Sequence, residues 1–532
     1  YPEEWDMNTA FGMLDMTNKD PDLKIDNMYV NPNTNIHILK NVPLDNTYRN
    51  TIYFSTAAQQ TSYFASMSKF TLTEYTYQRI DKTINVGINA ESLYDCNYIM
   101  FQNSSFGNKW FYAFITGVEY KGNNCSTISY EMDVMQTWFF DYTVKPCFVE
   151  REHILVDEIG ANLIEENLEL GEYIYDTAFR TGHMDNYVVV VAATVDAQGN
   201  VGTSTGGYGG IYSGCWLHVF EDFPAVAVFI DNLITNNKAD AIVSVFMMPS
   251  DFTTAVGAPA RNHVIEQDKQ RGAIDGYVPM NNKLFTYPYC FLYVTNLMGN
   301  SATYKYEYFQ TAKCTFNLGM DMSPNPLGML TPLGYKNVGA NYNEAITIGG
   351  FPQCSFTVDT YKAWLAQNGS SMAVDMLGSA MGAVAGLATG GPVGIVGGIA
   401  GATNAGRTLA RLNAIQAQPP QSHGSQSNTA QVAFGIKDFY FLNYHVRAEF
   451  AKIIDQYFNV YGYATHQVKV PNRSQRPHWN YVKTVNSNLT GSVPADDMAK
   501  LRGVYDNGIT FWKNGSEVGN YGLDNRAGGG GN

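Results

Sequence analysis

The chain carries little charge for its size and has no surplus of basic residues. Only 15% of its 532 residues are charged, and 34 Lys and Arg against 48 Asp and Glu give a net charge of −14. A protein that grips DNA or RNA needs clustered Lys and Arg to neutralise the phosphates. The composition therefore argues against a nucleic-acid-binding protein. It is compatible with a wall that nucleic acid passes without binding, and also with an acidic protein that is simply soluble.

Paired cysteines and metal-binding motifs are also missing. The seven cysteines are odd in number, widely spaced and without a Cys-x-x-Cys pair, so neither a zinc site nor a disulfide framework is predicted. The nine histidines form no His-Glu-x-x-His motif, and none lies at ligand spacing from another. We therefore expect no metal and no cofactor. This cysteine usage is typical of a chain made in a reducing cytoplasm, and the polar start at residues 1–5 predicts no secretory signal.

No catalytic constellation is complete either. Gly202–Gly206 fits the Gly-x-Ser-x-Gly pattern, but glycines follow where a nucleophile elbow requires a helix, so we interpret it as a flexible loop. We interpret His218, on a probable strand, as a packed or surface histidine, and the acidic pair Glu165 and Glu166 as solvated surface. A Walker phosphate-binding loop is absent. The sequence predicts that the chain is not an enzyme.

What the chain has in abundance is aromatic residues, 36 Tyr and 29 Phe, which suit half-buried pleated sheets. Alternation from Lys69 predicts a strand, and residues 109–120 and 127–134 predict two more, joined by a hairpin turn at 121–124. The fold class is therefore predicted to be mainly β with α insertions. Further strands are predicted at 187–194, 241–248, 285–295, 302–316 and 439–444, and helices at 224–236, 360–368, 448–458 and 494–501.

One stretch, Met372–Gly406, differs from everything else in the chain. Its only charged residue is Asp375, and glycine recurs at every fourth position through much of it. On a helix, that spacing places the glycines on one face as a groove that another backbone can approach closely. The glycines expected to pack in this way are Gly378, Gly382, Gly386, Gly390, Gly394 and Gly398.

Such a helix is poorly suited to an aqueous interior. Each interior glycine costs about 1 kcal/mol relative to alanine, whereas helix interfaces in lipid depend on close approach. We predict two short helical arms, 372–389 and 393–416, broken at Pro392. Because few of their residues are strongly apolar, insertion into a bilayer should be conditional. The predicted membrane-contacting residues are Met372, Val374, Met376, Leu377, Met381, Val384, Leu387, Val393, Ile395, Val396 and Ile399.

Other interpretations of this stretch stay open, namely a sequestered or plugging hairpin, a flexible Gly/Ala loop and a permanent transmembrane pair. The last is disfavoured because no other stretch is long and apolar enough to accompany such a pair. A polar Pro/Ser/Gln linker at 418–430 follows and favours a segment that can be extruded. Since lipid favours the neutral form of a carboxylate, Asp375 is a candidate for pH-sensitive insertion.

Short segments near both ends of the chain bracket the hydrophobic stretch in a fixed order. Together they resemble the tail knob, or distal tail tube, proteins of the small short-tailed podoviruses that infect Gram-positive bacteria. The segments are Asn108–Thr116, Glu131–Trp138, Lys145–Pro146 and Val149–His153 before the stretch, and Tyr461–Tyr463, Val468–Asn472, Trp479–Tyr481 and Gly508–Thr510 after it.

The resemblance implies a homo-hexameric tube of tail-hub-like β-barrel domains in the distal tail of a virion, assembled in the host cytoplasm. It implies that genomic DNA passes through the lumen without sequence-specific binding. It also implies that the hydrophobic loop plugs the tube and then penetrates the host cytoplasmic membrane during genome ejection. Other tail proteins, namely a lower collar or proximal tail protein and tail-tip proteins, would be its partners.

This resemblance divides the chain into four expected parts. They are an N-terminal β-rich tube domain (1–155), a second β-rich tube domain with an α/β insertion (156–360), the hydrophobic loop (361–430) and a C-terminal α+β segment that completes the tube (431–532). The alternative is a receptor-binding tail protein that recognises cell-wall polysaccharide, for which trimers or repeats would be expected.

Overall fold

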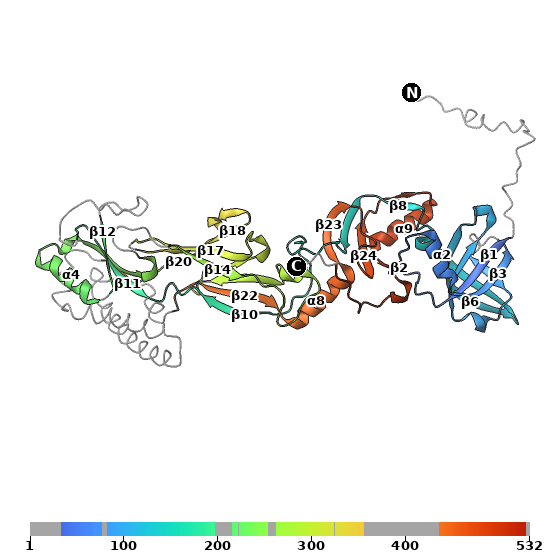
Figure 1. The fold of residues 1–532 in the computed structure, drawn as a ribbon, viewed down its shortest axis with the longest axis horizontal. Helices are drawn as coiled ribbons and strands as arrows, with labels where there is room; N and C mark the ends of the chain where they lie inside the picture. Colours follow the sequence, from blue (N-terminus) through green and yellow to red (C-terminus); the bar gives the residue numbers. More distant parts are fainter. Residues whose placement is uncertain are drawn as a thin grey trace, which may run out of the picture. The chain divides into compact units, whose positions relative to one another are not determined.

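A computed structural model describes residues 33–76, 82–196, 215–221, 223–253, 262–323, 325–355 and 436–527. Strands predominate among them, which confirms the prediction of a mainly β fold with helical insertions (Figure 1). The chain divides into two compact units, Tyr1–Asp157 together with Tyr457–Asn532, and Glu158–Gln456. The expected four-part division stays a prediction.

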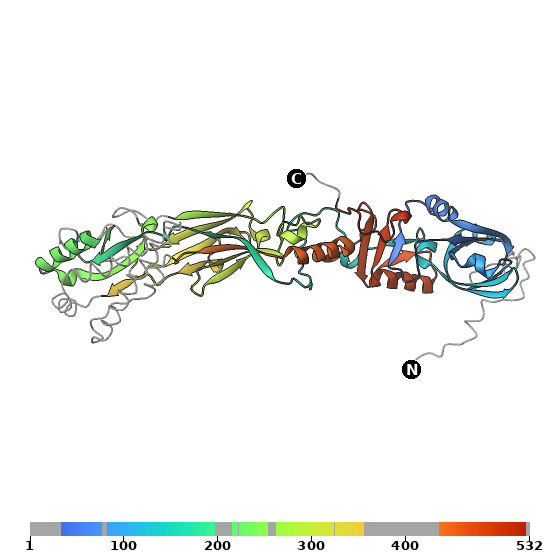
Figure 2. The ribbon, with the colours of Figure 1, turned by 90° about the horizontal axis from the view of Figure 1, so that it is seen from below.

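The first unit contains a six-stranded antiparallel sheet in the order β3-β1-β5-β6-β7-β4. Figure 2 shows it as a strongly curved layer. The predicted hairpin is confirmed, because Gly122 pairs with Cys125 across a turn that holds Asn124 at φ 52. The strands are β1 (Thr34–Lys40), β3 (Ser68–Tyr75), β4 (Thr83–Val86), β5 (Cys96–Gln102), β6 (Trp110–Gly122) and β7 (Cys125–Met132).

Aromatic packing and a buried carboxylate hold this sheet to its neighbours. The ring of Phe64, in helix α2 (Ala57–Ala65), stacks on Tyr98 at 5.2 Å and lies 4.8 Å from Tyr112. Asp133 caps the short helix α3 (Val134–Thr137) and also accepts a 2.7 Å hydrogen bond from the Tyr98 hydroxyl. Burial raises the pKa of Asp133 to about 6.

A second sheet of the first unit, β2-β26-β24-β9-β23, brings together both ends of the chain. Much of the family resemblance lies here, and its glycines have a structural reason. Gly462 has φ 65, and a Cβ there would lie 2.2 Å from the carbonyl oxygen of Glu152. The strands are β2 (Asn50–Ile52), β9 (Cys147–Glu152), β23 (Tyr463–Lys469), β24 (Trp479–Val485) and β26 (Ile509–Trp512); β8 (Tyr142–Val144), β25 (Leu489–Gly491) and helix α9 (Ala495–Asn507) complete the unit.

His153, beside this sheet, is a structural bridge. Its Nδ1 accepts a hydrogen bond from the Tyr481 amide at 2.7 Å, so its Nε2–H donates to the Asn459 carbonyl oxygen at 3.0 Å. Burial, together with the charge of Arg476, lowers the pKa of His153 to about 3. The imidazole is therefore neutral at physiological pH and serves packing rather than acid–base chemistry.

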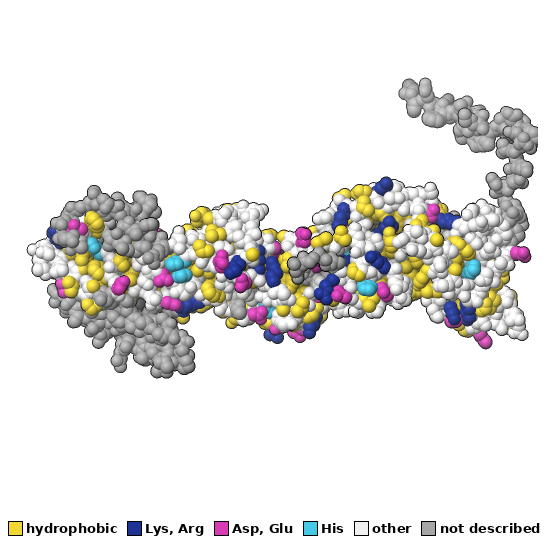
Figure 3. Space-filling view, in the orientation of Figure 1, with side chains coloured by type: hydrophobic (Ala, Val, Ile, Leu, Met, Phe, Trp, Pro, Cys, Tyr) yellow, Lys and Arg dark blue, Asp and Glu magenta, His cyan; other side chains and the backbone are white. Residues whose placement is uncertain are grey.

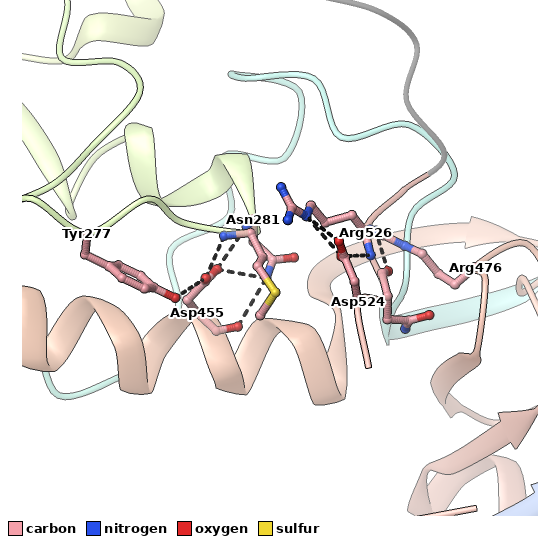
Figure 4. A network of polar contacts seen from close by, with 8 residues as sticks. Tyr277, Asn281, Asp455, Arg476, Asp524 and Arg526 are labelled. Atoms are coloured by element: carbon pink, nitrogen blue, oxygen red, sulfur yellow. Dashed lines mark hydrogen bonds and ion pairs between the residues drawn. The ribbon is translucent and has the colours of Figure 1, made fainter. Parts of the chain in front are cut away.

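The last described residues are fastened to the same unit by Asn525. Its side chain accepts from the His478 amide at 2.9 Å and donates to the Trp479 carbonyl oxygen at 2.9 Å. The guanidinium of Arg476 donates to the Asn525 carbonyl oxygen at 3.2 Å, and Asp524 accepts from Arg526 next to it (Figure 4). These contacts fix the chain end against β24.

The second unit contains two sheets that pack on each other through aromatic rings. The ring of Phe316 lies 5.3 Å from Phe441 and 5.0 Å from Tyr304. The first sheet, in the order β10-β22-β15-β16, consists of β10 (Tyr173–Arg180), β22 (Tyr440–Val446), β15 (Cys290–Thr295) and β16 (Ser301–Tyr304). The second consists of β14 (His263–Asp268), β17 (Lys313–Met320), β18 (Gly328–Tyr335) and β19 (Val338–Ala340), with β20 (Ile346–Ile348) also paired to β18.

A third sheet of this unit, β12-β11-β13-β21, carries helix α4 (Phe223–Thr235). Strand β11 (Tyr187–Ala193) is buried at every residue, as its continuous apolar run predicts. Phe229 of the helix packs 5.3 Å from Phe220, and the predicted helix at 224–236 is confirmed. The remaining strands are β12 (Trp216–Phe220), β13 (Ile242–Pro249) and β21 (Gln353–Ser355).

Two predicted strands are shorter than expected. The strand predicted at 285–295 begins only at Cys290, after a 3-10 helix at Asn282–Phe285 and Pro288, which has no amide hydrogen for a ladder. The strand predicted at 302–316 is interrupted by a 3-10 turn at Tyr306–Tyr308, so that it becomes the end of β16 and the start of β17.

Helix α8 (Ala448–Tyr461) confirms the helix predicted at 448–458, and its Asp455 organises the loop beside it. The fully buried carboxylate accepts from the Tyr277 hydroxyl and the Met280 amide, both at 2.7 Å. It also accepts from the backbone and side-chain amides of Asn281, both at 2.9 Å (Figure 4). One carboxylate thus holds residues 277–281 in place.

Candidate functional site at the base of the hydrophobic segment

The residues predicted to contact a membrane all lie in residues 356–435, outside the described part of the chain. The glycines spaced by four, Asp375 and the helix predicted at 360–368 lie there too, and the Gly202–Gly206 pattern lies in another range outside the described residues, 197–214. The structure does describe the chain that leads into this segment and the chain that leaves it. These two stretches, residues 349–355 and 436–446, define a candidate site that we call the segment base.

Each side of the segment base belongs to a sheet. On the entering side, β21 pairs with β13, and the Met247 amide donates to the Pro352 carbonyl oxygen at 2.8 Å. On the leaving side, β22 pairs with both β10 and β15. The segment therefore starts and ends on ordered strands of the second unit.

Lys437 joins the two sides directly. Its side chain is buried, with the residue only 1% exposed, and its ammonium group lies over the ring of Phe351 at 4.6 Å. The Nζ atom donates to the carbonyl oxygens of Gly349 at 2.5 Å and Gly350 at 3.1 Å. Burial lowers the pKa of Lys437 to about 8. The contact therefore joins Lys437, just after the segment, to Gly349 and Gly350, a few residues before it.

Asp438, the next residue, binds the turn at residues 180–182, where β10 ends. Its fully buried carboxylate accepts from the Thr181 hydroxyl, from the Gly182 amide at 2.9 Å and from the Arg180 guanidinium at 3.1 Å. Burial raises the pKa of Asp438, and these donors oppose that shift. Two adjacent buried residues of opposite charge thus hold the chain as it leaves the segment.

This pair was not predicted from the sequence. Lys437 and Asp438 stand between a polar linker and an aromatic strand, where charged residues are usually solvated. Only the contacts with residues far away in the chain, 349–350 and 180–182, distinguish them from surface residues. Burying the Lys437 ammonium group costs desolvation free energy, and its two carbonyl acceptors and the ring of Phe351 offset part of that cost.

Two other predictions can be compared with the described residues. His218 is a packed histidine, with Nε2 3.0 Å from the Val195 carbonyl oxygen and its ring 4.5 Å from Phe229. The interpretation of Glu166 as solvated surface is wrong, because its side chain is 1% exposed and pairs with the buried Lys283 at 2.6 Å. Glu165, 58% exposed, lies at the surface beside Lys305. The sequence around Glu166 is rich in acidic residues, and its partner Lys283 lies more than 100 positions away, so the local sequence gave no sign that this carboxylate is buried.

Among the helices of the described ranges, none combines the length and the apolar character that crossing a bilayer requires.

Comparison with known proteins defines the class of the chain first. Residues 32–143 match the family model for the N-terminus of caudoviral major tail proteins. The solved structure of the bacteriophage C1 tail knob protein, gp12, shares the fold, with a TM-score of 0.62 at 16% identity over 91% of this chain and 98% of that one. The mainly β architecture is thus that of a phage tail protein.

The family follows from the longer match. Residues 258–526, more than half of the chain, match the C-terminal domain of the tail knob protein gp9 of Bacillus phage phi29, and the chain belongs to this family. Tail knob proteins gp9 of Bacillus phages PZA, phi29 and B103 are 26%, 25% and 27% identical to it, each over 92% of this chain and 98% of the relative. The resemblance to tail knob proteins is confirmed. The chain is a structural component of a phage tail, made in the infected host.

Proposed function

We propose that this tail knob protein forms a homo-hexameric tube through which genomic DNA leaves the virion, and that the segment within residues 356–435 enters the host cytoplasmic membrane. One observation carries the proposal. A stretch with a single charge, Asp375, and glycine at every fourth position is inserted between two strands of a water-exposed β protein.

The segment base supports a hairpin that leaves the protein and returns to it. Lys437 contacts the carbonyl oxygens of Gly349 and Gly350, so the chain just after the segment is joined to the chain a few residues before it. Two helical arms that cross a bilayer out and back need such neighbouring anchor points on one side of the membrane. Each proposed arm, 372–389 and 393–416, is close to the about 20 residues that a bilayer crossing takes. In an oligomer, the glycine faces of neighbouring arms would allow close helix packing.

The charge distribution supports passage of DNA without capture. The net charge is −14, and in the face drawn in Figure 3 the Lys and Arg of the described residues are interspersed with Asp and Glu. Phosphates are held by clustered cations, whose counterion release drives binding. A tube with this composition would repel or ignore the duplex that moves through it.

Dye release from liposomes tests the membrane step with the full-length protein. We expect release by the natural chain and strong loss of release when Leu387, Val393, Ile395, Val396 and Ile399 are changed to Ser. A matched control changes Gln421, Gln426 and Asn428, in the adjoining linker, to Ser and should release dye like the natural chain. Equal release by all three proteins would assign membrane activity elsewhere and reject the role of the segment.

Asp375 provides a second test of the same segment. Because lipid favours the neutral carboxyl group, acid should promote insertion of the natural chain. Asp375→Asn should release dye with a weaker dependence on pH, and an unchanged pH profile would remove Asp375 from the mechanism.

Negative-stain images test the tube independently of the membrane. A sixfold ring with a central channel is the expected result. Trimers together with binding to purified cell wall would instead support the receptor-binding alternative.

A further inference from the structure

We propose that His183, Asp251 and His263 form a binding site for one divalent transition-metal ion of the Zn²⁺ class. One possible ligand atom from each residue lies within 4.8 Å of the other two. The site belongs wholly to the second unit, and its existence does not depend on the proposed tube or on membrane insertion. Spacing along the sequence did not predict it, because the three residues are separated by 68 and 12 positions.

The three side chains suit this class of ion. Two imidazoles and one carboxylate are ligands that Zn²⁺ takes at about 2.0–2.2 Å, so ligand atoms around one tetrahedral ion lie about 3.4 Å apart. His183 Nδ1 is 2.9 Å from Asp251 Oδ2. All three ligand atoms lie within 4.8 Å of one another, so rotation of the side chains can bring them around one ion. Water would fill the fourth position.

The backbone around the site is fixed from several sides. The turn that carries His183 is held by the Asp438 carboxylate, which accepts from the Gly182 amide at 2.9 Å. The Ser250 amide donates to the Asn186 carbonyl oxygen at 2.9 Å and joins this turn to the one that carries Asp251. Metal sites bind best when their ligands are held before the ion arrives.

His263 is positioned by a separate strand. It is the first residue of β14 and pairs with Leu318 of β17. Its ring meets Phe252 edge-on at 5.1 Å, and its Nε2 lies 3.2 Å from the Asp251 carbonyl oxygen. The rings of His183 and His263 stack at 3.9 Å with an interplanar angle of 19°, so the two imidazoles are direct neighbours.

The chemistry of binding balances without any co-reactant. In the metal-free protein, the imidazole N–H at His183 Nδ1 donates to the Asp251 carboxylate. Binding of the ion at Nδ1 displaces that proton to Nε2 or to solvent, and a nitrogen–metal and an oxygen–metal bond replace the hydrogen bond. The ion and the carboxylate together leave one positive charge at the site. His183 is 27% and Asp251 43% exposed, so an ion can reach them from solvent.

A bound ion would join three elements of the second unit. His183 follows β10, Asp251 follows β13 and His263 begins β14, so each ligand comes from a different sheet. The ion would therefore act as a cross-link among all three sheets. It would also stiffen the turn at residues 181–183 that receives Asp438 of the segment base.

Calorimetric titration of untagged, chelator-treated full-length protein with Zn²⁺ tests the proposal, with Co²⁺ absorption as a reporter of imidazole and carboxylate ligands. We expect one ion per chain. Loss of a residue that only hydrogen-bonds to a metal ligand weakens metal binding about 10–100-fold. Loss of a ligand itself should have a larger effect, so His183→Gln and His263→Gln should each weaken binding by more than about 100-fold. His466→Gln, an exposed histidine that stacks on Phe148, is the matched control and should bind normally.

Asp251→Asn is a variant that should still fold, because the amide keeps the shape of the side chain and a hydrogen-bonding oxygen. It removes only the negative charge that the ion requires. Zn²⁺ should raise the melting temperature of the natural chain and of His466→Gln, but not that of Asp251→Asn. The absence of binding by the natural chain would overturn the proposal. Equal binding by all the variants would also overturn it, since the ion would then lie elsewhere.

Discussion

The ammonium group of Lys437 lies 2.5 Å from the carbonyl oxygen of Gly349, although the residues are 88 positions apart. Between them lies the whole segment 356–435. A buried lysine that donates to two glycine carbonyls therefore joins the chain just after the segment to the chain a few residues before it. This contact fixes the described chain on both sides of the segment.

Lys437→Met tests the closure. The substitution keeps the length of the side chain but leaves the carbonyl oxygens of Gly349 and Gly350 without this donor, each at a cost of about 1–3 kcal/mol when buried. We expect faster protease cleavage near the segment base. Lys313→Met, at a half-exposed lysine of β17, is the control and should leave cleavage unchanged.

The pKa of Lys437 gives this test a pH dependence. Burial lowers the pKa of Lys437 to about 8 from its ordinary value of 10.5. Keeping the ammonium group protonated in the folded protein therefore costs free energy when the pH is below about 8. The penalty falls as pH rises from about 8 to 10.5, by about 3 kcal/mol in all. The unfolding free energy of the natural chain relative to Lys437→Met should therefore increase over this interval. A constant difference would contradict the burial of a charged lysine.

Asp133→Asn should show the opposite behaviour in the first unit. The folded pKa of Asp133, about 6, lies above the unfolded value of 3.8. Its neutral form is therefore favoured by folding, and that contribution is lost as pH rises from about 4 to 6. The natural chain should lose about 3 kcal/mol relative to Asp133→Asn across this range, as measured by denaturant unfolding. Parallel pH profiles would show that the carboxylate is solvated.

Gly462→Ala and Gly503→Ala form a matched pair. A Cβ at Gly462 would meet the Glu152 carbonyl oxygen at 2.2 Å, with φ at 65, so we expect a loss of about 3 kcal/mol or more. Gly503 lies inside helix α9 with open space around it, and alanine there should stabilise the protein by about 0.4–1 kcal/mol. Thermal unfolding measures both. Equal effects would remove the steric explanation for the glycine in the family segment Tyr461–Tyr463.

The buried pair Glu166 and Lys283 should respond to a double-mutant cycle. Glu166→Gln removes the charged partner of a buried ammonium group and should cost about 3–5 kcal/mol. Adding Lys283→Met should recover part of that loss. Glu165→Gln, at the exposed neighbour, should cost less than about 1 kcal/mol. Additive single effects would mean that the two buried charges do not interact.

Local patterns predicted the elements whose cause is local. The alternation in β3, the apolar run of β11 and the hairpin after β6 depend on neighbouring residues, and each was found where expected. The strand predicted at 285–295 was too long because a 3-10 helix and Pro288 occupy its first half. The spacing of apolar residues reports which side chains are buried. It does not report that Pro288 lacks the amide hydrogen that a strand pairing needs.

Long-range relationships could not be predicted from spacing. Lys437, Asp438 and Glu166 look solvated in the sequence, and only partners more than 80 positions away make them buried and paired. His183 and His263 are likewise brought together only by the fold, which places their rings 3.9 Å apart. The family resemblance, by contrast, was readable, because its segments are short and contiguous.

Photocrosslinking identifies the residues of this protein that enter a membrane. The purified knob protein is mixed with liposomes that contain a lipid with a photoreactive acyl chain, irradiated and digested, and the crosslinked peptides are mapped by mass spectrometry. We expect the crosslinks to fall within Met372–Ile399. Crosslinks confined to the described residues, with none in this stretch, would contradict it.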